Sequence, residues 1–400
     1  MRFRILVLAL GAFAVGTDGF VIAGILPDIA DSMGISLALA GLTITTFALV
    51  YAFGAPILSA WAGAIERRLL LLISLLVLTA ANLLAALAPS LPWLLAARVL
   101  AAVGAAMYTP TASAVAATLA PAQYRGRALA IVTTGLTAST VLGVPLGILI
   151  GAWISWQATL VFVALLSALA LLGVLLLFPH VAAPMAVPLR ARLAFLKRPN
   201  LLMALVHTLL MLIGIQIVAT YNRPLLQQFA HLDEVMVSAV LLLFGVAGVV
   251  GGVVGGYSVD RWGSIRTLVG GLIPLAAALL LLPWTAITLL GAALTLMAWG
   301  MAGWALLPVQ QHRLISIAPD SAGIVLSLNS SAIYLGISAG SALGSLLIQN
   351  TSLSVLCWVA AAWEASVLVL VLVSARASRR VEPKGESNNE SDWTVQLPAD

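Results

Sequence analysis

The feature that most constrains this chain is the recurrence of apolar stretches of about 20 residues along nearly its whole length. A helix of ~20 residues at ~1.5 Å per residue crosses a hydrocarbon layer of ~30 Å. Because 62% of the 400 residues are hydrophobic and 8% are charged, the apolar surface exceeds what a water-soluble core can bury. The twelve predicted membrane spans cover residues 5–27, 37–61, 69–88, 92–118, 127–152, 156–178, 200–222, 235–256, 265–283, 285–311, 322–348 and 352–375.

These spans are predicted to be helices, and the chain an all-α membrane protein. Backbone groups that face lipid must satisfy their hydrogen bonds within the segment, and the alternating pattern of a membrane β-barrel is not seen. The first span follows "MRFR" as in a signal peptide. We expect it to be retained, because it continues through "LPDIADSMG" without a small-residue cleavage site.

The basic residues predict the orientation of the spans. Seventeen of the nineteen Lys and Arg fall on one side; the exceptions are Arg98, inside a span, and Arg223. By the positive-inside rule the basic side is cytoplasmic, which places both termini in the cytoplasm. The net charge of +5 therefore reflects topology. We expect no nucleic-acid partner, since the basic residues are scattered over loops and form no continuous face.

The chain contains an internal repeat at an offset of 197 residues. Gly143 and Gly147 correspond to Gly340 and Gly344 at this offset, and Pro110 corresponds to Pro308 at 198. Repeated groups of spans with a binding site between them are how many transporters are built. The predicted division is a six-helix bundle over 1–178, a cytoplasmic connecting loop over 179–199, a second six-helix bundle over 200–375 and a disordered cytoplasmic tail over 376–400.

The stretch "GGYSVDRWGSIR" places charges between two apolar runs. Its glycines and charges resemble the G-x-x-x-D-R-x-G signature of the major facilitator superfamily, and they are Gly256, Asp260, Arg261, Gly263 and Arg266. We expect a short inner loop that pairs charges across neighbouring helix ends and locks the inner side. Its twin in the first half, "SAWAGAIERR", keeps only Arg67 and Arg68 and has Gly63 where the acid belongs.

Two further stretches extend the resemblance. "AARVLAAVGAAMYTP" carries Arg98 and Gly104 and looks like the Arg-x-x-x-x-x-Gly motif of that superfamily. "GLTASTVLGVPLG" is similar to its antiporter motif, although Gly143, Pro145 and Gly147 stand one residue tighter.

Together with "GTDGFVIAGILPDIA", these stretches resemble the twelve-span drug:proton antiporter family, in a branch of bacterial exporters of sugars such as arabinose, purine ribonucleosides and chloramphenicol. The resemblance implies two pseudo-symmetric six-helix bundles, alternating access, the bacterial inner membrane and a monomer.

Charged residues inside the spans need a reason, because each costs at least ~2.5–3.5 kcal/mol in lipid. Asp18 and Arg98 are predicted at one depth, roughly 21 Å above the inner edge. The first interpretation is that Asp18 carries the coupling proton and Arg98 tunes it; the second is a static ion pair. Glu364 is either a polar tie between helices or a second proton site, and His207 a packing histidine or a proton relay.

The cargo site and the moving surfaces are predicted from helices that face the centre in this family. The residues expected to line a substrate cavity are Met107, Tyr108, Met211, Gln216, Trp299 and Trp304. Each is alternatively a helix-packing residue. The glycines Gly143, Gly147, Gly340 and Gly344 allow close helix approach, and Pro145 bends its helix. They are expected where the halves slide, with packing alone as the alternative.

The function predicted from these features is export of a small organic compound, drug, sugar or nucleoside-like, in exchange for protons. Uptake by symport is the alternative within transport, and a non-transporting membrane sensor is the alternative of another class. The single Cys357 and four scattered His indicate no metal site and no enzyme. We expect no cofactor, only the proton gradient, and no partners except the small-molecule substrate and membrane lipid.

Overall fold

The computed structural model describes residues 2–62, 65–121, 124–181 and 189–381, and in these ranges it is helical without strands. Twelve of its helical stretches are long and apolar enough to cross a membrane, which confirms the predicted spans. The helices are α1 (Arg2–Met33), α2 (Leu37–Trp61), α3 (Arg67–Ala86), α4 (Leu91–Leu119), α5 (Arg125–Ala138), the π-helical turn η3 (Ser139–Gly143), α6 (Val144–Trp153), α7 (Trp156–Leu177), α8 (Leu189–Ala194), α9 (Pro199–Ala219), α10 (Asn222–Ala230), α11 (Glu234–Trp262), α12 (Ser264–Thr285), α13 (Leu289–Ile317), α14 (Ala322–Asn350) and α15 (Leu353–Val381).

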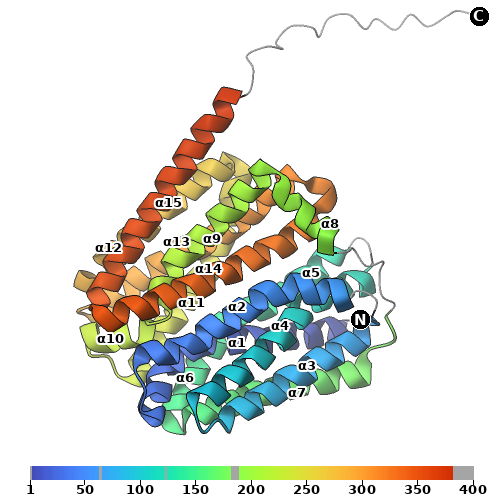
Figure 1. Cartoon of the computed structure of the whole chain (residues 1–400), viewed down its shortest axis with the longest axis horizontal. Helices are drawn as coiled ribbons and strands as arrows, with labels where there is room; N and C mark the ends of the chain where they lie inside the picture. The colour runs from blue at the N-terminus through green and yellow to red at the C-terminus, as the bar shows by residue number, and fades with distance from the viewer. Residues whose placement is uncertain (1, 63–64, 122–123, 182–188, 382–400) are drawn as a thin grey trace, which may run out of the picture.

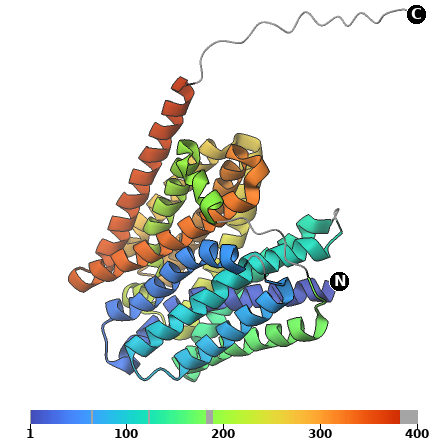
Figure 2. The same cartoon turned by 45° about the vertical axis from the view of Figure 1, so that its right-hand side comes forward.

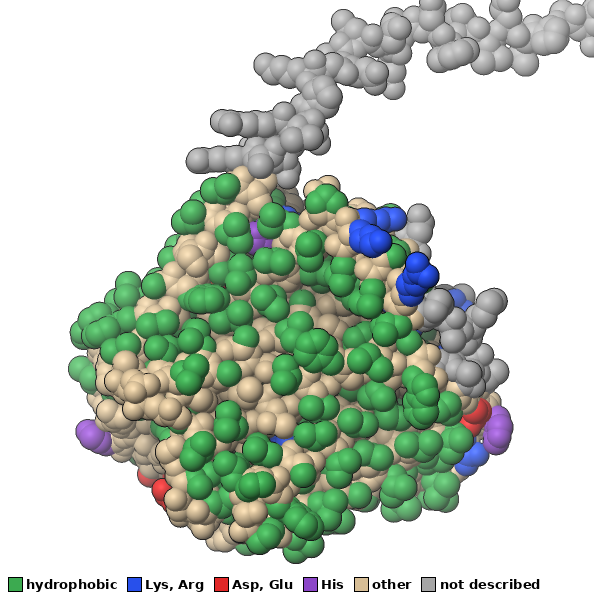
Figure 3. Space-filling model, viewed as in Figure 1, with side chains coloured by type: hydrophobic (Ala, Val, Ile, Leu, Met, Phe, Trp, Pro, Cys, Tyr) green, Lys and Arg blue, Asp and Glu red, His purple; other side chains and the backbone are tan. Residues whose placement is uncertain are grey.

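The helices form two groups, α1–α7 and α9–α15, that lie against each other (Figures 1 and 2). The groups converge toward the end that carries α10 and diverge toward the end that carries α8 and the N-terminus (Figure 1). We call the α10 end the outer end and the α8 end the inner end, following the orientation that the basic residues predict. Hydrophobic side chains cover most of the visible face, and charged side chains lie near its rim (Figure 3). This distribution suits a surface surrounded by lipid.

Helix ends follow local capping chemistry. The Ser36 and Ser155 hydroxyls and the Asp233 carboxylate each accept a bond from a backbone N–H in the first turn of α2, α7 and α11, which satisfies donors that the helix leaves free. The last helix, α15, continues to Val381. Residues 376–381, which we expected in the tail, are therefore helical, and 382–400 lie outside the described residues.

The signature stretch is not the loop that we expected. α11 runs through Asp260 to Trp262 and α12 begins at Ser264. The single residue between them is Gly263, with φ of 78°, a backbone conformation that strongly favours glycine. The helix persists because its glycines let it pack closely: a Cβ at Gly255 would lie 2.2 Å from the carbonyl oxygen of Ala305 on α13.

The fifth span is interrupted where its antiporter-like motif lies. Between α5 and α6, the amide of Val144 bonds to the carbonyl of Ser139 five residues earlier, which makes η3 a π-helical turn. The next residue is Pro145, which has no N–H to donate. The extra residue in the turn accommodates the proline, so the span is widened directly before Pro145. Turns of this kind occur often at functional sites.

Candidate functional site

A cavity lies between the two groups of helices. It encloses about 1320 Å³ of empty space, including the part continuous with solvent. The wall is mostly apolar. Its aromatic members come from both groups and are Phe20, Phe47, Phe244, Trp299, Trp304 and Tyr334. Besides the tyrosine hydroxyl and the indole N–H groups of the two tryptophans, the side chains that bring hydrogen-bonding groups are Thr140, Gln216, Asn222 and Arg223.

Half of the predicted cavity residues lie in this wall. Gln216, Trp299 and Trp304 line the cavity, and their contact with a substrate stays a prediction.

The other three cavity predictions are wrong, because the residues face neighbouring helices. Met107 packs with Ala62 and Leu70. The Tyr108 hydroxyl donates to the backbone oxygen of Leu8 at 2.9 Å, and Met211 is buried in the main hydrophobic core. Sequence position along a helix indicates depth but not the direction in which a side chain points.

Sequence reasoning missed the phenylalanines and Tyr334. One available signal was the repeat itself. Phe47 and Phe244 are separated by 197 residues, the same offset that relates Gly143 to Gly340, and both line the cavity.

The structure brings Asp18 of α1 and Arg98 of α4 together, as their predicted depth indicated. The Arg98 Nη1 atom donates to Asp18 Oδ1 at 2.7 Å, and Nη2 donates to the Asp18 backbone oxygen at 3.2 Å. The two side chains are 1% and 0% exposed. Asp18 Oδ2 has no hydrogen-bond partner. The pair is therefore a buried charge pair with an acceptor to spare, and whether it carries a proton stays a prediction.

Glu364 and His207 lie away from the cavity wall. Glu364 is fully buried on α15, in space that a Cβ at Gly214 would fill, 2.2 Å from its Oε1 atom. Neither carboxyl oxygen has a hydrogen-bond partner. His207 on α9 is also buried, with its Nδ1 atom 3.0 Å from Nη1 of Arg313. Both belong to packing within the C-terminal group, and their roles in proton coupling stay predictions.

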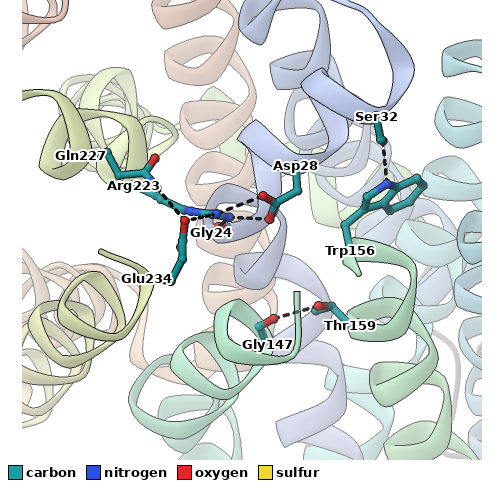
Figure 4. Close-up of polar contacts among 9 residues, drawn as sticks. All are labelled: Gly24, Asp28, Ser32, Gly147, Trp156, Thr159, Arg223, Gln227 and Glu234. Carbon is teal, nitrogen blue, oxygen red and sulfur yellow. Dashed lines mark hydrogen bonds and ion pairs between the residues drawn. The ribbon is translucent and has the colours of Figure 1, made fainter. Parts of the chain in front are cut away.

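The outer end is held by a charge cluster that the sequence did not reveal (Figure 4). Arg223 of α10 donates to both carboxylate oxygens of Asp28 on α1, at 2.5 and 3.0 Å, and to Glu234 on α11 at 2.6 Å. Gln227 donates to the same Glu234 oxygen at 2.8 Å. Burial alone would lower the pKa of Arg223, but its bonds to Asp28 and Glu234 raise it. Arg223 stays charged and links the two groups of helices.

The inner end shows the opposite arrangement. Asp260, Arg261 and Arg266 are exposed, and Arg261 bonds only to the Tyr257 hydroxyl, at 3.4 Å. Among the described residues, the ion pairs are those of Arg98 and Arg223. The charge-paired inner lock that we expected is therefore not formed among the residues that the structure describes.

The degraded twin of the signature has a different anchor, Glu66. Its carboxylate accepts bonds from the backbone N–H groups of Arg68, Leu69 and Val181 at 3.2, 2.9 and 2.8 Å. Burial would raise the pKa of Glu66, but these backbone bonds lower it. The Arg67 amide donates to the backbone oxygen of Val181, which follows α7, and the Arg68 guanidinium donates to the backbone oxygen of Leu175 within α7. These residues therefore tie α3 to the end of α7 within one group.

The four repeated glycines do not lie where the groups meet. A Cβ at Gly143 or Gly147 would meet Thr17 or Val21 of α1 at 2.2 Å, and one at Gly340 or Gly344 would meet backbone atoms of α9 at 2.5 and 2.7 Å. Each pair packs a helix against a neighbour in its own group, which is the packing alternative. The groups instead meet through α2 with α14 and α11 with α6, where Ser338 donates to the Thr45 backbone oxygen at 3.1 Å.

A cavity between two repeated groups of membrane-spanning helices, with a buried charge pair behind its wall, defines the class of secondary membrane transporters. The sequence model of the Major Facilitator Superfamily matches residues 8–340. The chain belongs to this superfamily. It is a multi-pass membrane transporter and not an enzyme.

Individual relatives extend over nearly the whole chain. An uncharacterized MFS-type transporter, YbcL of Bacillus subtilis, is 36% identical over 371 residues, covering 93% of this chain and 94% of the relative. A chloramphenicol resistance protein of Streptomyces lividans is 33% identical over 361 residues, covering 88% and 91%. A probable sugar efflux transporter of Mannheimia succiniciproducens is 29% identical over 380 residues, covering 94% and 95%.

A solved structure confirms the fold. The crystal structure of a D-xylose-proton symporter matches with a TM-score of 0.76 at 17% identity, covering 92% of this chain and 97% of that chain. At this identity the likeness is one of fold.

Proposed function

We propose that this chain exports a small, largely apolar organic compound in exchange for protons, by alternating access in the bacterial inner membrane with both termini in the cytoplasm. The observation that carries the proposal is a buried, paired Asp18 directly behind the wall of a central cavity between two repeated halves. Burying an ionisable group at this depth costs free energy, so its presence suggests a function. The chloramphenicol resistance and sugar efflux relatives favour the export direction.

The cargo class follows from the wall of the cavity. A sugar carries many hydroxyl groups, and each one buried without a partner costs about 1–3 kcal/mol. Thr140, Gln216 and Asn222 offer few such partners, whereas Trp299 and Trp304 offer broad apolar faces. An uncharged amphiphilic compound with a ring system suits this wall better than a sugar does.

The charged residues at the two ends of the molecule account for the alternation between an inward-open and an outward-open state. Arg223 closes the outer end in this structure, while the charges of the signature stretch at the inner end are unpaired. In the opposite state, the Arg223–Asp28 pair would break and the inner charges would pair. Protonation of Asp18 from outside would remove its charge and weaken its hold on Arg98. Return of the proton to the cytoplasm would restore the pair and complete the exchange.

The test is proton movement in inside-out vesicles with an acidic lumen, because the lumen of such vesicles corresponds to the outer side of the membrane. Addition of a transported compound should dissipate the gradient. The panel comprises chloramphenicol as first probe, a nucleoside and arabinose, and we expect the response with chloramphenicol. Asp18→Asn should abolish it. Asp31→Asn is the matched control, because Asp31 is an exposed acid on the same helix, and it should respond as the wild type does.

Two results would overturn the proposal. A wild-type protein that moves no proton with any compound is not a proton exchanger. A proton response that Asp18→Asn leaves at full size would show that Asp18 does not carry the coupling proton. A response to arabinose alone would retain exchange and overturn the apolar cargo class.

A further inference from the structure

The side chain that separates the cavity from the buried ion pair is Phe47 of α2. It lines the cavity and is 3% exposed. The guanidinium carbon of Arg98 lies over this ring, 4.4 Å from its centre. Arg98 in turn holds Asp18 at 2.7 Å. Neither Asp18 nor Arg98 lines the cavity, so cargo in the cavity contacts the ring and not the pair.

The same ring also contacts the other half of the molecule. Tyr334 of α14 lies with its ring centre 6.5 Å from that of Phe47, and it stacks on Tyr51 of α2 at 3.7 Å. Tyr334 lines the cavity as well. Because α2 and α14 belong to different groups of helices, any rocking of the groups changes the packing on Phe47. Phe47 therefore contacts the cavity, the second group of helices through Tyr334, and the ion pair through Arg98.

We propose that Phe47 is the positioning residue through which bound cargo acts on the Asp18–Arg98 pair. This inference rests on the proposed function. Cargo that packs against Phe47 keeps the ring over Arg98, where a cation is attracted to the ring face, and so holds Arg98 on the carboxylate of Asp18. When the cargo leaves and Tyr334 moves, the ring is free to turn and the grip of Arg98 on Asp18 loosens.

The chemical step is a proton transfer. In the loosened state, Asp18 takes a proton from outer water and becomes a neutral carboxyl. When new cargo restores Phe47 and Arg98, the O–H bond breaks, the proton passes to water on the inner side, and the carboxylate pairs again. The titratable groups that act on Asp18 are Arg98 of α4 and Tyr334 of α14. Of the other helices packed against α1, α2 carries Tyr51. The basic residues of α5 lie at the inner end of α5. The segments η3, α6 and α7 carry no titratable side chain.

The repeat provides a matched control. Phe244 lies 197 residues after Phe47 and also lines the cavity. Its ring packs edge-on against Trp299, with centres 5.5 Å apart, and no charge stands behind it. Phe244→Leu therefore removes the same side chain from the same cavity without touching an ion pair.

The experiment measures cargo flux and proton flux together in proteoliposomes, with chloramphenicol as the probe, or the panel compound that gives the wild-type signal. Phe47→Leu should lower chloramphenicol movement down its own gradient about as much as Phe244→Leu does, because both rings line the cavity. The number of protons that it moves per chloramphenicol should fall at least tenfold. Phe244→Leu should lower both fluxes together, so that protons moved per cargo stay unchanged. Phe47→Tyr retains the ring face and should restore the wild-type ratio.

The outcomes separate this inference from the function beneath it. If the wild type moves no proton with any panel compound, the proposed function fails and the role of Phe47 fails with it. If the wild type exchanges protons and Phe47→Leu keeps the wild-type ratio, only the role of Phe47 is overturned. If Phe47→Leu loses both fluxes, Phe47→Tyr decides: a variant that recovers cargo flux without proton flux also contradicts the inference.

Discussion

The two halves of the molecule place a phenylalanine at equivalent positions in the cavity wall but put different groups behind it. Behind Phe47 in the first half stands Arg98, paired with Asp18. The ring of Phe244 in the second half packs edge-on against the indole of Trp299, which also lines the cavity. The backbone repeat is thus retained while the chemistry has diverged. The first half holds a buried ion pair beside the cavity, and the second half offers shape and apolar surface.

The buried acids differ between the halves in the same way. Asp18 has an arginine partner at 2.7 Å, whereas the carboxyl oxygens of Glu364 have no hydrogen-bond partner among the described residues. We expect the paired acid next to the cavity to gain or lose a proton when its arginine partner moves. An acid enclosed between α9 and α15 is placed to pack. The predictions below test this division, from the largest effect to the smallest.

The largest effect is expected from breaking the charge pair of the first half. Arg98→Met leaves the Asp18 carboxylate buried without a partner, which costs about 3–5 kcal/mol of folding stability and abolishes cargo-driven proton movement. Trp299→Ala costs a similar ~3–5 kcal/mol through lost packing but retains protons per cargo. Unfolding in detergent and the flux ratio measure the two effects.

A double variant sharpens this test. Asp18→Asn combined with Arg98→Met removes both charges, and replacing a whole buried pair is often near neutral for stability. We expect the double variant to regain most of the lost stability without regaining proton exchange. Recovery of exchange would show that the pair is structural only.

The next effect concerns the two ends of the molecule. Arg223→Gln removes the charge that binds Asp28 of the first group and Glu234 of the second group, so the outer end should open more often. A single cysteine at Gly24, with Cys357 replaced by Ser, should then be labelled from outside about tenfold faster. Asp260→Asn at the inner end should instead slow this labelling, because the inner charges that would pair in the outward-open state lose their acid; Asp260 is exposed here. Equal labelling of all variants would contradict the role of Arg223.

A smaller effect is expected at Glu364. Glu364→Gln keeps the shape of the side chain in the space beside Gly214, so both fluxes should stay within about threefold of wild type. The vesicle assay used for Asp18→Asn measures this directly. Loss of proton exchange in Glu364→Gln would place a second proton site in the second half and remove the contrast between the halves.

The smallest effect lies in the inner turns. Because the folded pKa of Glu66 is lowered, its bonds to the N–H groups of α3 and Val181 contribute stability above its unfolded pKa of about 4.3. This contribution is lost as pH falls through the folded value. Glu66→Ala should cost about 1 kcal/mol at pH 7, as loss of a helix cap does, and Asp260→Asn less than about 0.5 kcal/mol. Amide exchange at Val181, compared between variants at pH 7 and at successively lower pH, should differ most at pH 7 and converge as Glu66 becomes protonated.

Much of the fold was predictable because lipid imposes a strict local rule. Every span must be long, apolar and helical, so the twelve spans follow from residue type alone. The meeting of Asp18 and Arg98 was predictable from depth, since a helix advances by a constant ~1.5 Å per residue. Local sequence failed at the signature stretch, where close packing of α11 on α13 at Gly255 carries the helix through to Trp262.

The sequence by itself determined the number of spans, the repeat, the family and the depth of each buried charge. Only the tertiary structure decided which way each side chain points: it directs Tyr108 into its own bundle, joins Arg223 to Asp28, and sets Phe47 between the cavity and Arg98. The physical reason is that helical rise is a property of the local chain. The rotation of one helix against another is fixed by side-chain packing between residues far apart in the sequence, which a single sequence does not encode in any local pattern.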